Sequence, residues 1–173
     1  MSAPELSCRR LVLRALQPED VPGLGRLNSD PRVTRYLNTE PMTLAEATDR
    51  ARRHWPDLHD GRFGLWAIAR RDDGRLVGTA SLDPFGDGRG AAEIAYRLLP
   101  EAWGRGLAGE AAARLIDHGF STLGVRQVNA VAHPRNAASQ SILERLGLRY
   151  TGLCRAHGFM FARLFRRDRL PPR

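Results

Sequence analysis

The sequence contains no lysine, few cysteines and no long hydrophobic run. All 27 basic residues of the 173-residue chain are arginines, and with 19 acidic residues the formal net charge is +8 at pH 7. The two cysteines, Cys8 and Cys154, are too few for a disulfide scaffold and lack metal-site spacing, so we expect reduced thiols and no metal. No run of about 18 apolar residues could span a membrane, and the N-terminal residues do not resemble a signal peptide. We therefore expect a cytoplasmic protein without a membrane partner.

The excess of positive charge suits a polyanion, such as a phosphate-bearing ligand or RNA. The arginines, however, are scattered singly or in pairs, and the densest run is Arg166, Arg167 and Arg169. Scattered charges favour a solvated basic surface over a nucleic-acid groove. An RNA-associated module stays an alternative, and it would lose RNA affinity steeply as the salt concentration rises.

The length suits one domain with one main core, so we expect residues 1–173 to form a single domain. Apolar periodicity and turn residues predict strands before and after a long crossover helix. We therefore expect an α/β fold with a central mixed, mostly antiparallel sheet and helices on both faces. The predicted strands cover 11–13, 63–69, 76–82, 93–99, 127–132, 149–153 and 159–165; the predicted helices cover 18–28, 43–58, 107–120 and 136–146, with a helical turn near 31–36.

Residues 91–120 are the most informative stretch, because they predict a strand, a tight glycine turn and an amphipathic helix. Gly104 and Gly106 flank Arg105, and Ala108 follows, so no bulky side chain obstructs the turn. The first N–H groups of the helix lack intrahelical partners and lie at the positive end of its dipole, where an anion such as pyrophosphate binds. A plain strand-to-helix turn needs the same small residues. Neither a P-loop nor the three-glycine dinucleotide motif is present.

The turn is similar to the acyl-CoA pyrophosphate loop of the GNAT N-acetyltransferase superfamily, whose pattern is Gln/Arg-x-x-Gly-x-Gly/Ala. Gly106 and Ala108 match this pattern, and Trp103 replaces the Gln or Arg. That replacement resembles the RimJ/RimL type, a branch that includes acetyltransferases of ribosomal-protein N-termini.

A second block supports the resemblance. The residues Asn136 to Ser139 are similar to the Asn-x-x-Ser helix of that branch, and Leu146 to Leu148 to its Leu-Gly-Phe ending, with leucine in place of the aromatic residue. The resemblance covers nearly the whole chain. It implies the GNAT fold and direct transfer of an acetyl group from acetyl-CoA, the co-substrate, to a primary amine.

The resemblance also implies which residues contact acyl-CoA. The pantetheine arm would follow strand 93–99 toward the end of strand 127–132, where a splayed parallel pair exposes backbone groups that can bond its amides. The implied set comprises the backbones of Leu98 and Leu99, the pyrophosphate-binding residues Trp103, Gly104, Arg105, Gly106, Leu107 and Ala108, and the side chain of Asn136. Asn136 is equally suited to be a plain helix N-cap, and the two roles are compatible.

Acetyl transfer needs a neutral amine, stabilisation of the oxyanion and a proton for the departing thiolate. Many superfamily members carry a tyrosine that acts as the general acid on the helix after the fifth main strand, and this segment contains no tyrosine. Ser139 offers a hydroxyl there, as a donor, as part of a relay or as a hydrogen-bonding group. Glu93 is the candidate base because its strand runs beside the thioester, with a solvated or ion-paired carboxylate as the alternative. His133 is a weaker candidate.

Two further functions stay open beside N-acetyl transfer: a non-catalytic acyl-CoA-binding domain and the RNA-associated module. The acceptor is either a protein N-terminus or a small-molecule amine, because one scaffold hosts many acceptors. Tyr36 and Trp55 are candidate acceptor contacts or ordinary core aromatics. Self-association into a homodimer is left open.

Overall fold

The computed structural model describes residues 3–54, 60, 62–86 and 90–170. Its strands form one eight-stranded sheet in the order β1-β2-β3-β4-β5-β6-β8-β7. Neighbouring strands are antiparallel except for the central β5 and β6, which are parallel. The strands are β1 (Leu6–Ser7), β2 (Leu11–Arg14), β3 (Gly64–Arg70), β4 (Leu76–Pro84), β5 (Ala91–Leu98), β6 (Gln127–Ala132), β7 (Arg149–Ala156) and β8 (Phe159–Asp168).

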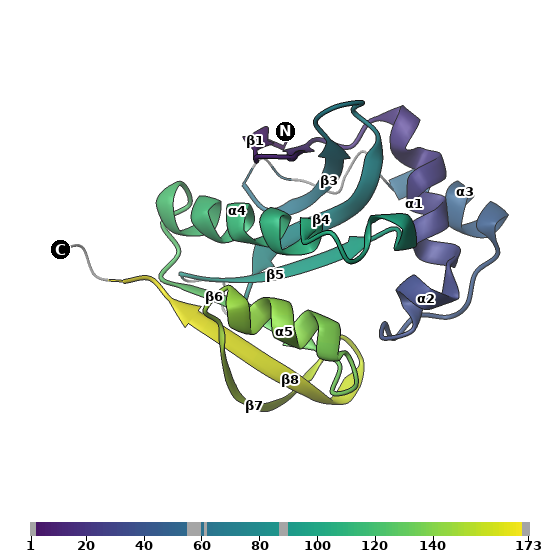
Figure 1. The fold of residues 1–173 in the computed structure, drawn as a ribbon. Coiled ribbons are helices and arrows are strands. Elements are labelled where there is room, and N and C mark those ends of the chain that lie inside the picture. The colour runs from purple at the N-terminus through teal and green to yellow at the C-terminus, as the bar shows by residue number, and fades with distance from the viewer. Residues whose placement is uncertain (1–2, 55–59, 61, 87–89, 171–173) are drawn as a thin grey trace.

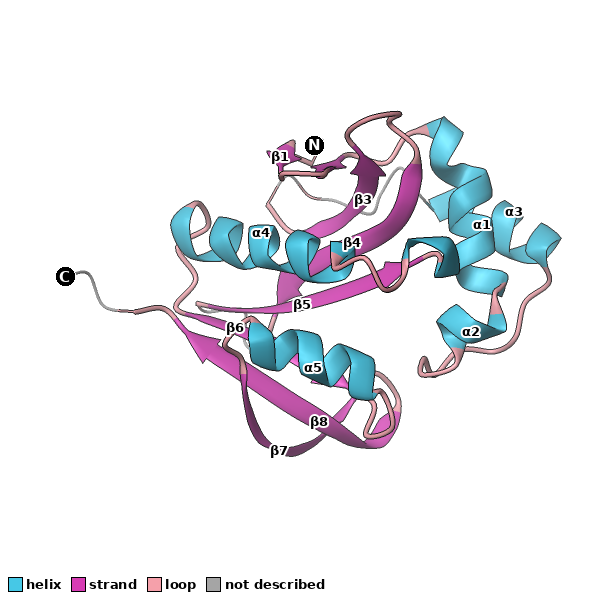
Figure 2. Ribbon diagram, viewed as in Figure 1, coloured by secondary structure: helices cyan, strands magenta, loops and turns pink. Residues whose placement is uncertain are grey.

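Helices cover both faces of this sheet (Figures 1 and 2). Side chains alternate along a strand, and β3 shows the consequence: Trp66 and Ile68 join the core beneath α4, whereas Ala67 joins a second core with α1. The predicted mixed α/β sheet is confirmed. The helices are η1 (Pro18–Asp20), α1 (Val21–Ser29), α2 (Pro31–Thr34), α3 (Leu44–His54), η3 (Pro100–Ala102), α4 (Leu107–Ser121) and α5 (Ala137–Arg145).

Each predicted strand and helix has a counterpart in the structure, and the differences lie mainly at the ends. Strand β1 was not predicted because two residues carry no periodic pattern. Strands β7 and β8 extend further than predicted because the turn between them is only His157 and Gly158, both with positive φ (50° and 79°). Two such residues fit the tight hairpin turns that match the twist of a β-hairpin. The predicted end of the helix at 43–58 lies outside the described residues.

Gly78 allows β4 and β5 to approach closely at the end of β5. A Cβ added there would lie 2.2 Å from the carbonyl oxygen of Arg97 and 2.9 Å from the Cα of Leu98, and backbone atoms cannot rotate away. Gly78→Ala should therefore lower the free energy of unfolding by about 1–3 kcal/mol. Gly109→Ala in α4 is the control, since its Cβ would meet only the Ile142 Cγ2 atom at 3.9 Å.

The control should raise the free energy of unfolding by up to about 1 kcal/mol, because alanine replaces glycine within a helix. Urea denaturation of both variants measures the two changes. A Gly78→Ala protein as stable as the wild type would contradict the close approach of the two strands.

Candidate functional site

The turn before α4 has the geometry that an anion site needs. Gly104 and Gly106 both have φ near 72°, a left-handed conformation that favours glycine, and Gly106 is the N-cap of α4. The first intrahelical bond runs from the Glu110 N–H to the Gly106 carbonyl oxygen at 3.2 Å. The N–H groups of residues 107–109 therefore point out of the start of the helix, at the positive end of its dipole. The exposed Arg105 lies between the two glycines.

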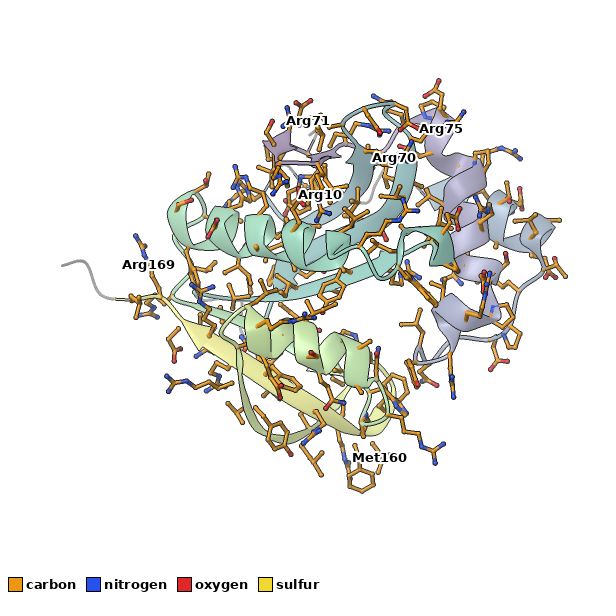
Figure 3. The ribbon with its side chains drawn as sticks, in the orientation of Figure 1. Arg10, Arg70, Arg71, Arg75, Met160 and Arg169 are labelled. Carbon is orange, nitrogen blue, oxygen red and sulfur yellow. The ribbon has the colours of Figure 1, made fainter. Side chains whose placement is uncertain are left out.

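Arg10, the residue just before β2, stabilises this turn from beside α4 (Figure 3). Its Nη1 donates to the Arg105 carbonyl oxygen at 2.8 Å, and its Nε donates to Glu110 Oε2 at 2.7 Å. Burial opposes ionisation of Glu110, but the hydrogen bonds and charge of Arg10 outweigh it and lower the pKa of Glu110. Sequence reasoning missed Arg10, because nothing local to it indicates a partner about a hundred residues away.

Trp103 ties the same turn to the end of β5. Its indole Nε1 donates to the Leu98 carbonyl oxygen at 2.8 Å. The Leu99 N–H donates to Val77 at 2.8 Å, and the Leu99 carbonyl accepts from Ala102 at 2.9 Å. Both backbone groups of Leu99 are therefore occupied, and Leu99 has no donor to offer a pantetheine arm. At Leu98 only the N–H remains for that role.

The parallel pair β5 and β6 separates after three residue pairs. The last pair is Glu93 with Asn129, although β5 continues to Leu98 and β6 to Ala132. Hydrogen bonding alternates along an antiparallel ladder, and the Ala91 carbonyl and Leu99 N–H both bond on the β4 side. The backbone groups of the even-numbered residues Tyr96 and Leu98 consequently point toward β6, beyond the last pair. Figure 1 shows β5 and β8 diverging toward the C-terminal end of β5. The predicted splay is present.

Tyr96 places a phenol at the helix after β6, where the sequence offered no tyrosine. Its hydroxyl oxygen lies 3.2 Å from Ser139 Oγ and also donates to the Ser139 carbonyl oxygen at 3.4 Å. Burial raises the pKa of Tyr96 to about 12, with the hydrogen bond to Ser139 acting in the opposite direction. The phenol is therefore protonated at neutral pH. The sequence feature that could have identified Tyr96 is its even position in the strand, which places it on the same face as the buried Ile94 and Leu98.

Asn136 holds the start of α5. Its Oδ1 accepts the Ser139 N–H at 3.2 Å, which confirms the predicted N-cap role. The cap fixes the turn that presents the Ser139 hydroxyl to Tyr96. Any contact with pantetheine would come from the same side chain in addition to this bond.

Glu93 is not a freely solvated carboxylate, because it is hydrogen-bonded to His157. Its Oε1 lies 2.6 Å from His157 Nε2, and the Glu93 side chain is 15% exposed. His157 lies in the β7–β8 turn with a positive φ, and no local sequence pattern indicates its contact with Glu93. Because side chains alternate along β5, Glu93 and Tyr96 project to opposite faces of the sheet. The predicted catalytic residues Glu93 and Ser139 therefore approach the divergent strand edge from opposite sides.

Three aromatic rings from distant segments gather beside this edge. The His133 ring stacks on Tyr36 at a centroid distance of 5.2 Å and meets the Phe159 ring edge-on at 5.4 Å. His133 Nδ1 accepts the Arg135 N–H at 3.1 Å. The predicted wall residue Tyr36 thus contacts the end of β6 and the start of β8. Trp55, the other predicted wall residue, lies outside the described residues.

Across the part of the chain that the structure describes, no helix is both long and apolar enough to cross a membrane. Within the same residues, no group of three or more His, Cys, Asp or Glu side chains is arranged to hold a metal ion.

Comparisons with known proteins agree with this geometry. Residues 10–149 match the family model of the acetyltransferase (GNAT) domain. The uncharacterised N-acetyltransferase YoaA of Bacillus subtilis (strain 168) is 32% identical over 155 residues, 89% of this chain and 88% of that protein. Spermidine N(1)-acetyltransferase of Escherichia coli (strain K12) is 28% identical over 147 residues, 84% and 76% of the two chains. Mycobacterium smegmatis RimJ, solved in complex with CoA-disulfide, superposes with a TM-score of 0.78 at 20% identity, covering 97% of this chain and 87% of that chain.

The structural likeness to RimJ shows a shared fold and carries no statement about the acceptor. The family model covers more than half of the chain, and YoaA exceeds 30% identity over most of both proteins. This chain is therefore a member of the GNAT acetyltransferase family.

Proposed function

We propose that this protein transfers an acetyl group from acetyl-CoA to a primary amine, and that the amine is the α-amine of a protein N-terminus. The observation that carries the proposal is the left-handed glycine turn at the start of α4, next to a parallel strand pair that separates after Glu93. The turn suits a pyrophosphate and the separated strands suit the amides of a pantetheine arm. Family membership supports acetyl-CoA as the co-substrate, which supplies the reactive thioester.

The residues that would hold the co-substrate form one continuous track. The backbone N–H groups of residues 104–108 and the Arg105 side chain would bind the pyrophosphate. The backbone groups of Tyr96 and the N–H of Leu98 would bond the amides of the arm, with Asn136 on its other side. Trp103 and Arg10 keep this track in shape through the Leu98 and Arg105 carbonyl oxygens.

Acetyl transfer forms a nitrogen–carbon bond and breaks the carbon–sulfur bond, so one proton leaves the amine and one reaches the thiolate. The hydrogen-bonded pair of Tyr96 and Ser139 would supply the second proton, because a phenol with a pKa of about 12 is protonated at neutral pH. A phenol is a stronger acid than a serine hydroxyl, so Ser139 would relay the proton or orient Tyr96. Glu93, held by His157, would accept the amine proton directly or through water.

The proposed acceptor follows from the weakness of the proposed general base, Glu93. A lysine side-chain amine has a pKa near 10.4 and is almost wholly protonated at neutral pH, whereas an α-amine titrates near 8. Glu93 is already paired with His157, so it suits the α-amine, which needs less assistance to lose a proton than a lysine side chain does. The likeness to the RimJ/RimL type around Trp103 also supports an N-terminal acceptor.

A small-molecule amine is the second candidate. The relative named spermidine N(1)-acetyltransferase is 28% identical over most of this chain, which favours testing polyamines beside peptides. A non-catalytic acyl-CoA-binding domain would bind the co-substrate without releasing thiol. Free-thiol release with a panel of amines separates these alternatives.

Acetyl-CoA should raise the melting temperature, because a ligand that binds only the native state stabilises it by mass action. Gly106→Asp should abolish this shift, since it places a negative charge where the phosphates would bind. Gly124→Asp is the matched control, because Gly124 lies past the other end of α4 with a similar φ of 70° and open space around it. It carries the same backbone strain and charge change, and its shift should equal that of the wild type. Equal shifts in all three proteins would contradict the proposed phosphate site.

Ser139→Ala should lower kcat by about 10- to 100-fold while acetyl-CoA affinity stays nearly unchanged, because the hydroxyl acts in proton transfer rather than binding. Tyr96→Phe should lower kcat at least as much, since it removes the acidic hydroxyl itself. Ser141→Ala, on the exposed face of the same helix, is the control. Steady-state thiol release measures all three variants. Full turnover in Ser139→Ala would remove this residue from the mechanism.

Peptides with free N-termini should be acetylated faster than N-blocked peptides of matched sequence that contain lysine, because the α-amine is partly neutral at pH 7. Mass spectrometry of the products locates the acetyl group. The protein contains no lysine, so it adds no side-chain amine to the background. Preferential lysine modification would contradict an α-amine acceptor, and inactivity on both peptides would favour a small-molecule amine.

A further inference from the structure

Arg97 is a half-buried guanidinium that pairs with a neutral group. Its Nη1 donates to Asn28 Oδ1, at the end of α1, at 2.9 Å. Within the described ranges of the chain, none of the ion pairs involves Arg97. Burial, and then repulsion from Arg50 of α3, lower the pKa of Arg97. A guanidinium has five N–H donors, and holding it away from water without an anion is costly.

Arg97 lies on the same face of β5 as the proposed base. Side chains alternate along a strand, so Glu93, Ala95 and Arg97 project together. Ala95 is exposed, whereas Leu99, the next residue on this face, is buried in the core with α1. Four residues of strand place the Cα atoms of Glu93 and Arg97 about 13 Å apart. This face therefore offers a carboxylate at one end, a cation at the other and an open surface between them.

We propose that Arg97 binds a carboxylate on the acceptor, so that the preferred acceptor carries both an amine and a carboxylate. The inference rests on the proposed acetyl transfer and specifies its acceptor. Asn28 occupies Nη1, which leaves the edge formed by Nε and Nη2 for two parallel hydrogen bonds to a carboxylate. The acceptor carboxylate would supply the anion that Arg97 lacks.

The same charges act against a polycationic acceptor. An acceptor with a second ammonium group would place that charge near Arg97 and Arg50, which already repel one another. Rejection of like charge is a common source of specificity. The required carboxylate has two sources: the α-carboxylate of a free amino acid, or an acidic side chain near a peptide N-terminus.

Equilibrium binding tests the inference without turnover. The protein is saturated with CoA, which has no acetyl group to transfer, and is titrated calorimetrically with two matched pairs of ligands. L-leucine and L-leucinamide differ in the α-carboxylate, and Ala-Asp-Ala-amide and Ala-Asn-Ala-amide differ in the side chain. The carboxylate member of one pair should bind about 10- to 100-fold more tightly, as expected for a charged hydrogen-bonded pair. The pair that shows the preference identifies the source.

Three variants assign that preference to Arg97. Arg97→Gln should abolish it, whereas Arg26→Gln should keep it, because Arg26 is half exposed in a surface pair with Glu101 and the loss of charge is the same. Asn28→Asp places a carboxylate against Arg97 within the protein. It should raise the melting temperature and abolish the preference. Asn28→Asp therefore still tests the inference if the Arg97→Gln protein fails to fold.

Two results would overturn the inference: equal binding of both members in each pair, or a preference that persists in Arg97→Gln or Asn28→Asp. Thiol release from acetyl-CoA by the same proteins tests the proposed function separately. A preference that depends on Arg97 without thiol release would support the inference and contradict acetyl transfer. Thiol release at equal rates with the carboxylate and amide members of each pair would support acetyl transfer and contradict the inference.

Discussion

Beyond Glu93, strand β5 has a neighbour on one edge only, and the site depends on that constraint. Backbone N–H and C=O groups need partners, and a strand that leaves its ladder must find them elsewhere. The pairing of β5 with β6 ends at Glu93 and Asn129, while β5 continues for five more residues. A ligand with amide groups can complete this edge in the way that another strand would. The recognition of a pantetheine arm would thus be a property of the sheet itself.

The neighbouring contacts keep this edge in place. Gly78 lets β4 lie close against the end of β5, and the Leu99 N–H is bonded to Val77 in that ladder. Trp103 bonds the Leu98 carbonyl, and Arg10 holds the Arg105 carbonyl. A preorganised site loses less entropy on binding than a mobile one. The glycine turn is therefore held by Arg10 from outside the motif and by Trp103 from within it.

The sequence predicted the features that depend on nearby residues. The turn at 104–108, the amphipathic helix α4 and the Asn136 cap each follow from residues a few positions apart. The contacts of Tyr96 with Ser139 and of Glu93 with His157 join residues 43 and 64 positions apart, and their formation depends on strand register and turn geometry. No local pattern encodes that register. The residues that local patterns miss are accordingly those that the sheet brings together, and they include Tyr96, which supplies the phenol that the helix after β6 lacks.

The geometry of β5 would keep three proposed roles apart. The Tyr96 side chain lies on one face of β5, Glu93 and Arg97 lie on the other, and the backbone edge between them faces β6. With the proposed roles, a substitution at position 97 would change the charge of the acceptor face without moving the edge or the phenol. Acceptor preference would therefore change while the proposed acyl-CoA track stays constant. This independence gives a physical reason why one scaffold serves many acceptors.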